Sequence, residues 1–286
     1  DSGIIIRENI IFENLPPRHR NSHKGSYGWM LGVGSDHGMS GALRLCGEAA
    51  LRSGAGKVTL ATRAEHASLV NLSCPELMVR SMEQDGALAE LLEEVDVLVT
   101  GTGLGQSDWS AEMFRVCMAA KVPVVLDADG LNLLARLYSH PSKEELPLEH
   151  WILTPHPAEA GRLLGCTARE IQQDRVGAAQ RLARKYHAVV VLKGCGTVVA
   201  DPAGRYAICP LGNPGMASAG TGDVLAGIIG AMLAQGLDLW DAATTGVVAH
   251  AAAGDLVAMQ QGELGMLASD ITACLPLVLN VDSLGG

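Results

Sequence analysis

Short apolar runs alternate with longer mixed segments along the chain, and this alternation predicts strands followed by helices. Runs such as residues 95–100 (VDVLVT) and 188–192 (AVVVL) are almost continuously apolar, which is typical of strands buried on both faces of a parallel sheet. The expected strands are residues 27–33, 57–61, 95–100, 123–126, 152–154 and 188–192. The pattern therefore predicts an α/β fold with a mostly parallel central sheet and helices on both faces.

The two ends of the chain depart from this regular alternation. Residues 1–25 are polar and contain two adjacent prolines, so we interpret them as an N-terminal arm or linker ahead of a single domain at residues 26–286. Toward the other end, residues 197–200 and 205–209 predict a hairpin around a D-P-A-G turn. Helices are expected at residues 64–72, 171–186, 239–254 and 268–279.

The composition narrows the class of protein. A net charge of −10 argues against non-specific binding to nucleic acid or to anionic membranes. The seven cysteines include no C-x-x-C pair and no metal-site spacing, so a reducing compartment is expected. Because there is no uninterrupted apolar run of about 18 residues and no N-terminal signal pattern, the sequence predicts a soluble, cytoplasmic protein.

A glycine-rich loop at residues 212–222 leads directly into the apolar segment VLAGIIGAMLA. Gly220 and Gly222 allow positive φ angles and close approach to a ligand, and the free N–H groups at the start of the following helix favour an anion such as phosphate. Asp223 stands in that first turn, where a carboxylate either caps the helix or does chemistry. Beside a phosphate cradle we favour chemistry: Asp223 takes a proton from a substrate hydroxyl as a phosphoryl group moves onto it.

Other turns follow predicted strands and are expected at the same edge of the sheet, because open α/β sheets bind ligands at the carboxyl ends of their strands. The glycine-rich turn before Ala42 is either a substrate-contacting turn or a plain connection between strand and helix. Gly105 ends a second such turn, after residues 95–100. His156 lies between two prolines after residues 152–154. Its ring is therefore expected to have a fixed orientation and to contact substrate.

Two further groups of residues carry candidate chemistry. Residues 193–197 (KGCGT) follow a predicted strand and offer an ammonium, backbone amides and a hydroxyl to a diphosphate, although they do not form the G-x-x-x-x-G-K-[ST] phosphate loop. Asp127 or Asp129 either caps the helix that follows, or one of the two helps to hold Mg²⁺ or water near the phosphates. His250 lies in an alanine-rich segment and is interpreted as a packed histidine.

Taken in order, these stretches resemble the ADP- or ATP-dependent NAD(P)H-hydrate dehydratases, a branch of the ribokinase-like superfamily. The resemblance rests on HKGSYGWMLGVGSDHGMSGALR, GTGLGQ, LDADGLNLL, LTPHPAEAGRLLGC, VVVLKGCGTVVA, GNPGMASAGTGDVLAGIIGAMLAQG and GMLASDI. Several blocks in a fixed order are far more specific than the GTGD of residues 220–223, which is typical of the whole superfamily. The resemblance therefore implies a ribokinase-like fold.

The resemblance also implies an activity. Members of this family restore NADH and NADPH from the S epimers of NADHX and NADPHX, in which water has added across the C5–C6 bond of the nicotinamide ring. ADP, or alternatively ATP, drives the reaction together with Mg²⁺. By this resemblance Asp223 acts on the C6 hydroxyl, and Ala42, Gly105 and His156 contact the hydrated dinucleotide. The residues implied to bind the nucleotide are Lys193, Gly194, Cys195, Gly196, Thr197, Gly220, Thr221 and Gly222.

Three further expectations come from the same resemblance. The protein is expected to be a homo-oligomer. Its start at Asp1 and its linker-like first residues suit the C-terminal half of a longer chain that begins with an NAD(P)H-hydrate epimerase domain. Cys195 is a departure, since relatives often carry alanine there, and it places a thiol near the expected nucleotide site.

Two other functions remain open from the sequence. A small-molecule kinase of the same superfamily, acting on a vitamin precursor, would share GTGD and the anion site but would leave the phosphate on its product. A non-catalytic nucleotide-sensing module would have no use for Asp223. LTPHP and KGCGT favour the dehydratase over the kinase, and an intact Asp223 favours an enzyme over the sensor.

Overall fold

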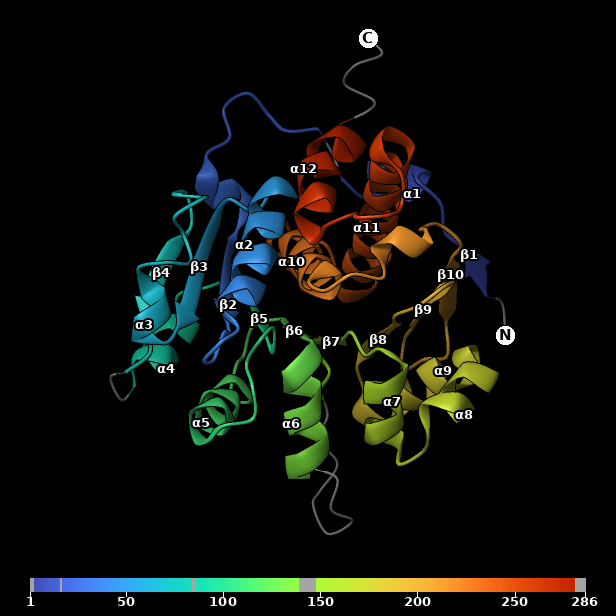
Figure 1. The fold of residues 1–286 in the computed structure, drawn as a ribbon, viewed down its shortest axis with the longest axis horizontal. Helices are drawn as coiled ribbons and strands as arrows, with labels where there is room; N and C mark the ends of the chain where they lie inside the picture. Colours follow the sequence, from blue (N-terminus) through green and yellow to red (C-terminus); the bar gives the residue numbers. More distant parts are fainter. Residues whose placement is uncertain (1–2, 16, 84–85, 139–147, 281–286) are drawn as a thin grey trace.

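The computed structural model describes residues 3–15, 17–83, 86–138 and 148–280, and this part of the chain is built around one ten-stranded sheet (Figure 1). The strand order is β1-β10-β9-β8-β7-β6-β5-β2-β3-β4, and only β9 runs antiparallel to its neighbours. The strands are β1 (Ile4–Ile5), β2 (Trp29–Val33), β3 (Lys57–Thr62), β4 (Met78–Ser81), β5 (Val97–Thr100), β6 (Val124–Leu126), β7 (Trp151–Leu153), β8 (Val189–Leu192), β9 (Thr197–Ala200) and β10 (Tyr206–Cys209). The predicted mostly parallel α/β sheet is therefore confirmed.

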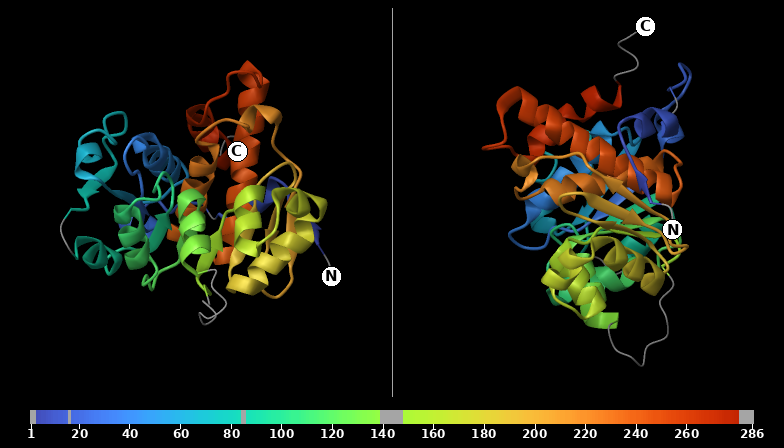
Figure 2. Two further views of the ribbon diagram at one scale, coloured as in Figure 1. Left: turned by 60° about the horizontal axis from the view of Figure 1, so that its bottom comes forward. Right: turned by 90° about the vertical axis from the view of Figure 1, so that its right-hand side faces the viewer.

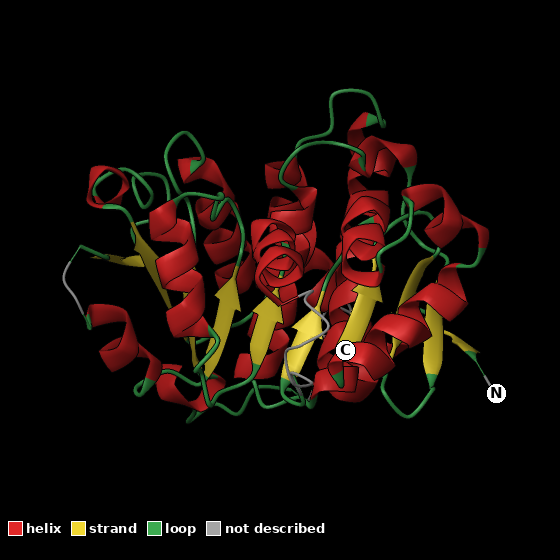
Figure 3. Cartoon of the chain, turned by 90° about the horizontal axis from the view of Figure 1, so that it is seen from below, coloured by secondary structure: helices red, strands yellow, loops and turns green. Residues whose placement is uncertain are grey.

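Helices cover both faces of the sheet, as predicted, and each layer forms its own buried apolar cluster with the strands (Figures 2 and 3). One layer holds α1 (Asn9–Asn14), α2 (Ser40–Arg52), α10 (Thr221–Ala234), α11 (Leu239–Gln261) and α12 (Ala268–Leu279). The other holds α4 (Ala87–Leu92), α5 (Asp108–Cys117), α6 (Ala128–Tyr138), α7 (Pro157–Leu164), α8 (Ala168–Gln173) and α9 (Arg175–Tyr186). The short elements α3 (Ala64–Ala67), η1 (Lys24–Tyr27) and η2 (Pro214–Met216) lie in connections.

The N-terminal segment differs from the free arm expected at residues 1–25. β1 pairs in parallel with β10, and α1 packs with Ile11 only 1% exposed. Ile6 and Ile11 explain this, since both are buried and burying them is favourable. Ile4 and Ile5 of β1 stay exposed, and the strand is held by its pairing with β10. Part of the expected arm is therefore built into the domain.

Several helix boundaries also differ from expectation. The helix expected at residues 64–72 ends at Ala67, and the one expected at residues 171–186 is divided into α8 and α9. The division lies at Asp174, whose side chain accepts a hydrogen bond from the Gly177 N–H and so begins a new helix. β4, α4 and α5 were not anticipated; β4 has only four residues and α4 only six, which is too short to show a clear period.

α11 continues seven residues beyond the expected 239–254 and ends at Gln261. Within the described residues it is the one helix long and apolar enough to cross a membrane, and 67% of its apolar stretch is buried inside the domain. It lies against α10 and α12 in the same layer (Figure 1). Its apolar character is accounted for by this position in the core.

α10 is apolar on all sides because it is enclosed by the sheet, α2 and α11. Its contact with α2 is so close that a Cβ atom on Gly227 would lie 2.1 Å from the carbonyl oxygen of Cys46. Since α10 begins at the glycine-rich loop, this contact fixes the position of Asp223 relative to the sheet.

Replacing Gly227 with alanine is expected to destabilise the protein by about 1–3 kcal/mol. The added methyl group would clash with the backbone of Cys46, which cannot move away as a flexible side chain could. Gly41→Ala in α2 is the matched control: nothing lies within 4 Å of its Cβ position, and alanine favours a helix by about 1 kcal/mol over glycine. Urea unfolding of the two variants measures the difference. Equal stabilities would contradict the tight contact between α2 and α10.

Candidate active site

Two glycine-rich turns, one after β2 and one after β5, are joined at the carboxyl edge of the sheet. The Asp36 N–H donates to the Gly103 carbonyl oxygen at 2.7 Å. A Cβ atom on Gly103 would lie 2.8 Å from that of Ala42, so the start of α2 packs directly on the second turn. The structure thus brings Ala42 and the turn that ends at Gly105 together.

A buried carboxylate, Asp36, anchors this pair of turns. It accepts hydrogen bonds from Arg63 Nε at 2.6 Å and from Ser107 Oγ at 2.6 Å. Burial acts to raise the pKa of Asp36, but the hydrogen bonds from Ser107, the His37 N–H and Arg63 outweigh burial and lower the pKa to about 2. A Cβ atom on Gly105 would lie 3.0 Å from Asp36 Oδ2. Asp36 therefore stays ionised and supports the turn directly beneath Gly105.

A buried ion pair joins the end of β8 to the end of β6. Lys193 Nζ lies 2.5 Å from Asp127 Oδ1, and Thr154 Oγ1 donates to the same oxygen at 2.7 Å. Burial acts to lower the pKa of Lys193, but Asp127 and Glu159 outweigh burial and raise it. A Cβ atom on Gly222 would lie 3.2 Å from Lys193 Nζ. The ammonium group therefore stands between Asp127 and the glycines that begin α10.

Asp223 lies in the first turn of α10, next to the ion pair of Lys193 and Asp127. The preceding Gly220 has a φ of +91°, a left-handed conformation that favours glycine. Burial raises the pKa of Asp223 to about 7; Asp127 adds to the rise, Lys193 opposes it, and Asp129 adds a smaller contribution. In the described part of the chain no side chain or amide is hydrogen-bonded to this carboxylate, so it is not a helix cap. A carboxylate with a pKa near neutrality suits proton transfer.

Asp129 connects the acidic group to the turn after β5. Its Oδ2 accepts a hydrogen bond from the Gly105 N–H at 2.8 Å. It is partly exposed, whereas Asp127 is 1% exposed. The hydrogen bonds of both carboxylates go to other segments of the chain, and none of those found in the described residues goes to an amide of α6.

His156 is held by its own helix. Its Nδ1 accepts from the N–H groups of Ala158 and Glu159 at 3.0 and 3.3 Å, which caps α7. Its Nε2 lies 3.2 Å from Glu159 Oε1, and Glu159 Oε2 accepts from the His156 N–H at 2.8 Å. This pattern places the ring proton on Nε2. Both ring nitrogens are therefore engaged within α7, and the side chain is about half exposed.

Glu159 is itself a buried carboxylate of the site, 4% exposed. Burial raises its pKa to about 7, with Lys193 opposing and Asp127 adding to the rise. Burial also lowers the pKa of His156, and the charge of Lys193 acts in the same direction. His156 is therefore neutral at physiological pH and cannot act as a cation toward phosphate.

Arg175 holds the backbone of the KGCGT loop, residues 193–197, in place. Arg175 Nη2 donates to three carbonyl oxygens around the loop, at distances of 3.0–3.3 Å. Gly194 and Gly196 have φ angles of +141° and +66°, which explains why glycine occupies both positions. The Cys195 thiol is exposed, and Thr197 Oγ1 donates back to the Gly194 carbonyl at 3.0 Å. The loop is thus preformed: Arg175 holds its carbonyl groups, and the Lys193 N–H donates to the Pro155 carbonyl oxygen at 2.9 Å.

The glycine-rich loop before α10 is attached to α11. Asp255 accepts hydrogen bonds from the Gly212 N–H and from Asn213 Nδ2, both at 2.9 Å. One face of α11 also carries His250, whose Nε2 is buried without a hydrogen-bond partner in the described residues. Burial lowers the pKa of His250 to about 4, in keeping with the packed, neutral histidine expected from the sequence.

Several of these supporting residues were not singled out from the sequence. They are Asp36, Thr154, Arg175 and Asp255. Asp36 and Thr154 lie within the sequence blocks GSDHG and LTPHP, but their partners could not be predicted, because the segments they bind lie 27 residues away. Arg175 and Asp255 lie in none of the blocks, and the segments they hold lie 17 and 43 residues away.

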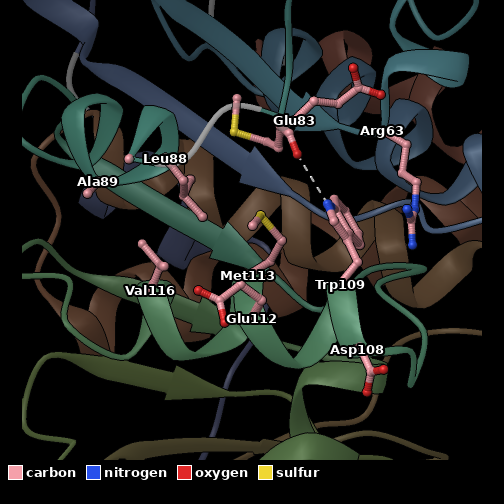
Figure 4. A pocket seen from close by; sticks show the side chains of 11 residues that line it. Arg63, Glu83, Leu88, Ala89, Asp108, Trp109, Glu112, Met113 and Val116 are labelled. Atoms are coloured by element: carbon pink, nitrogen blue, oxygen red, sulfur yellow. Dashed lines mark hydrogen bonds between the residues drawn. The ribbon is translucent and has the colours of Figure 1, made fainter.

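A separate pocket of about 540 Å³ lies between α4 and α5, and none of the residues that the sequence singled out lines it. Figure 4 shows Trp109, Met113 and Val116 of α5 opposite Leu88 of α4. The Arg63 guanidinium stands over the Trp109 ring, 4.6 Å from its centroid. Arg63 also donates to Asp36, so this pocket adjoins the turn that ends at Gly105. The candidate active site is the acidic group around Asp223, where the glycine-rich loop, Lys193 and the buried carboxylates meet.

Known proteins resemble this chain over most of its length. Residues 30–277 match a family model described as NAD(P)H-hydrate dehydratase. The chain is 48% identical over 270 residues to the bifunctional NAD(P)H-hydrate repair enzyme of Coxiella burnetii, covering 94% of this chain and 54% of that protein. It therefore spans about half the length of the curated relatives it matches.

Solved structures resemble the whole chain. The ADP/ATP-dependent NAD(P)H-hydrate dehydratase of Bacillus subtilis, co-crystallised with ATP and Mg²⁺, superimposes with a TM-score of 0.85 at 32% identity, covering 98% of this chain and 99% of that one. A ribokinase-like superfamily protein of Enterococcus faecalis has a TM-score of 0.87 at 28% identity, covering 97% and 95%. The resemblance seen in the sequence motifs is thus confirmed over nearly the full length. This chain belongs to the NAD(P)H-hydrate dehydratase family.

Proposed function

We propose that this domain removes water from the S epimers of NADHX and NADPHX, restoring NADH and NADPH, at the expense of ADP or ATP. The observation that supports this most directly is the position of Asp223. Its carboxylate has a raised pKa, begins a buried helix, and lies next to an ammonium group at the glycine cradle. This is the arrangement needed to deprotonate an alcohol while a phosphoryl group is transferred to it.

The proposed roles follow the arrangement of the turns. The N–H groups of Gly220, Thr221 and Gly222 hold the transferring phosphoryl group, because they are the free amides of the first turn of α10. Residues 193–197 bind the nucleotide with the amides of a loop that Arg175 holds open. The hydrated ring lies between these groups and the joined turns.

Ala42, Gly105 and His156 are proposed to contact the hydrated dinucleotide. Ala42 is small and lies against the turn that ends at Gly105, so both positions allow close approach. His156 contributes its ring face, since Glu159 and the amides of α7 engage its nitrogens. These contacts orient the ring so that its C6 hydroxyl faces Asp223.

The chemistry then follows from these groups. Hydroxide is a poor leaving group and phosphate a good one, so phosphorylation of the C6 hydroxyl prepares the ring for elimination. Asp223 accepts the hydroxyl proton, and the amides of α10 stabilise the charge that develops on the phosphoryl oxygens. Donors of this kind contribute on the order of 3 kcal/mol each.

Mg²⁺ is proposed to enter with the nucleotide. Asp127 Oδ2 fits such a role, because it is a buried oxygen without a hydrogen-bond partner in the described residues and lies 3.6 Å from the Cβ position of Gly222. The described residues contain no group of three or more His, Cys, Asp or Glu side chains that could hold a metal by themselves, so the phosphates would supply most of the ligands. When bound, the ion would offset the negative charge of those phosphates.

The rate is expected to rise with pH through about 7 and to level off above it. Asp223 acts as a base only when it is ionised, and its pKa is raised to about 7. The measurement is kcat/KM for NADHX at saturating nucleotide across the neutral range. A profile that is flat there, or that falls as pH rises through 7, would contradict Asp223 as the base.

The chain covers 54% of its Coxiella burnetii relative, which is named as bifunctional, so we propose an NAD(P)H-hydrate epimerase domain fused ahead of this one. We also propose a cytoplasmic location and a homo-oligomeric state, tested by fractionation of cells that produce the protein and by light scattering of the purified protein.

The direct test is incubation of the protein with NADHX and Mg²⁺ together with ADP or ATP in parallel. Absorbance of the reduced nicotinamide and release of inorganic phosphate are followed at the same time. A dehydratase produces both in equal amounts, whereas a kinase of the same superfamily would leave the phosphate on its product. Failure to restore NADH with either nucleotide would overturn the proposal.

A further inference from the structure

The pocket between α4 and α5 has no role in the proposed mechanism, although it lies at the same edge of the sheet as the candidate active site. Arg63 and Met82 line it and directly follow β3 and β4, and Asp108 lines it three residues after Gly105. β3, β4 and β5 run parallel to one another. The carboxyl edge of the sheet, where open α/β sheets bind ligands, therefore continues from the active site into this pocket.

The order of the strands places the pocket on the other side of Asp223 from the nucleotide. The loop proposed to bind the nucleotide follows β8, α10 packs on β6, β5 and β2, and the pocket lies at β3 and β4. This inference rests on the proposed function, in which the substrate is a dinucleotide whose adenosine half extends away from the hydrated ring. Since the phosphoryl donor occupies the β8 side, the adenosine half is directed toward β3 and β4.

Arg63 connects the pocket to the turn that is proposed to contact the ring. Its Nε donates to Asp36 Oδ1 at 2.6 Å, and its guanidinium lies 4.6 Å from the centroid of the Trp109 ring. Asp36 Oδ2 in turn lies 3.0 Å from the Cβ position of Gly105. One side chain thus touches both the support of the substrate turn and the aromatic wall of the pocket, so the two are adjacent.

The walls of the pocket suit a flat aromatic base. Trp109 Nε1 donates to the Met82 carbonyl oxygen at 3.3 Å, which fixes the indole. Figure 4 shows Arg63 on one side of the indole and Met113 and Leu88 on the other, so a flat ring between them would stack on the indole. Stacking on an aromatic side chain is favourable for every nucleobase, and a volume of about 540 Å³ is typical of small-molecule sites.

The charges of the pocket suit a ribose better than a phosphate. Among the described residues that line it, Arg63 is the one cation, and it is already paired with Asp36. The lining carboxylates are Glu83, Asp108 and Glu112. Of these three, only Glu112 forms an ion pair with a described residue, the exposed Arg115. A carboxylate accepts hydrogen bonds from ribose hydroxyls and repels a phosphate attached to them, so the lining favours a ribose without phosphate.

We propose that this pocket binds the adenosine end of the hydrated dinucleotide and that its carboxylates favour NADHX over NADPHX. The adenine stacks on Trp109, the ribose hydroxyls donate to the carboxylates, and the rest of the dinucleotide leads back past Gly105 to the ring. NADPHX carries a further phosphate on this ribose, which the carboxylates repel. The pocket thus sets the affinity for the substrate and the preference between the two hydrates, while the chemistry stays at Asp223.

Calorimetric titration of the whole chain with NADH, NADPH and reduced nicotinamide mononucleotide tests the proposal. NADH is the stable product and has the same adenosine end as NADHX, whereas the mononucleotide lacks it. Saturating ADP and Mg²⁺ keep the nucleotide site occupied, so NADH cannot bind there through its own adenosine. The wild type is compared with Trp109→Leu, Trp109→Phe and Asp108→Asn.

The wild type is expected to bind NADH about tenfold more tightly than the reduced mononucleotide, which is the scale of stacking one base on an aromatic ring. Trp109→Leu should remove this advantage by weakening NADH binding, with the Kd of the mononucleotide unchanged. Trp109→Phe keeps an aromatic ring and should retain most of the advantage. Because the readout is a ratio of two affinities, a partly unfolded variant does not imitate the expected result.

NADPH is expected to bind the wild type on the order of tenfold more weakly than NADH, because like charges meet at the ribose. Raising the salt concentration should narrow this difference, and so should Asp108→Asn, which removes a lining charge in the first turn of α5. Asp241→Asn is the matched control: it removes a carboxylate from the first turn of α11, outside the pocket, and should leave the difference as it is.

Equal binding of NADH and the reduced mononucleotide to the wild type would overturn the proposal. So would an equal loss of both in Trp109→Leu, which would make Trp109 only a support for Arg63 and the turn at Gly105. Binding of NADPH as tight as that of NADH would overturn the role of the carboxylates. The dehydratase assay tests the proposed function separately: selective binding of NADH without dehydration of NADHX would refute the reaction but not the site.

Discussion

Replacing Asp223 with asparagine is expected to lower turnover by at least about 10²-fold, because the proton of the C6 hydroxyl then has no acceptor as the phosphoryl group arrives. The same change is expected to stabilise the fold above neutral pH. Burial raises the pKa of Asp223 from 3.8 to about 7, so ionising it in the folded state is unfavourable. At low pH the carboxyl is protonated and does not destabilise the fold. As pH rises through 7 the free energy of unfolding falls, by up to about 4 kcal/mol for a pKa shift of this size.

The asparagine variant removes this ionisation and should therefore unfold at a higher urea concentration than the wild type at pH 8, with the difference disappearing in acid. Asp241→Asn is the matched control, since Asp241 is also in the first turn of a helix, α11, but away from the site. Its turnover should equal that of the wild type. If the protein were a non-catalytic nucleotide-sensing module, the variants would bind nucleotide as the wild type does. Neither the wild type nor any variant would then turn over substrate.

Replacing Lys193 with methionine is expected to destabilise the protein by about 3–5 kcal/mol and to abolish turnover. The substitution leaves Asp127, which is 1% exposed, as a buried carboxylate without its ion-pair partner, and that situation is strongly unfavourable. It also removes the ammonium group next to Gly222, where the phosphoryl group is proposed to sit. Equilibrium unfolding and the phosphate-release assay measure the two effects separately.

The exposed ion pair between Lys121 and Glu93 provides the control, because its side chains are 83% and 72% exposed and 3.4 Å apart. Lys121→Met is expected to change stability by less than about 1 kcal/mol. Combining Lys193→Met with Asp127→Asn should recover part of the lost stability, since the uncompensated charge is gone, but none of the activity. A small loss of stability for Lys193→Met alone would show that Asp127 is solvated rather than buried.

Much of the fold and of the chemistry could be predicted because it depends on neighbours along the chain. Continuous apolar runs such as VLVT in β5 predict buried parallel strands, and the sheet contains them. The glycines before Asp223 predict a left-handed backbone ahead of a helix, and Gly220 has that conformation. The family was likewise recognisable from ordered blocks of sequence, since the turns at the carboxyl ends of the strands are short and each carries its own motif.

Other features could not be predicted, because they depend on partners that are distant in sequence. From the sequence, Lys193 is predicted to offer its ammonium group to a diphosphate. In the structure Asp127, 66 residues away, holds this group in an ion pair. The orientation of the His156 ring is fixed by its contacts with Glu159 rather than by the flanking prolines. The polar appearance of residues 1–25 concealed a strand that pairs with β10, about 200 residues later.

The sequence alone determined that this is a mostly parallel α/β protein of the NAD(P)H-hydrate dehydratase family with an acid at the head of an apolar helix. Local backbone preferences and apolar periodicity act over a few residues, so they can be read along the chain. Only the tertiary structure decided the raised pKa values of Glu159, Lys193 and Asp223. Burial and opposing charge set their protonation, and both arise from segments that meet only when the sheet is assembled.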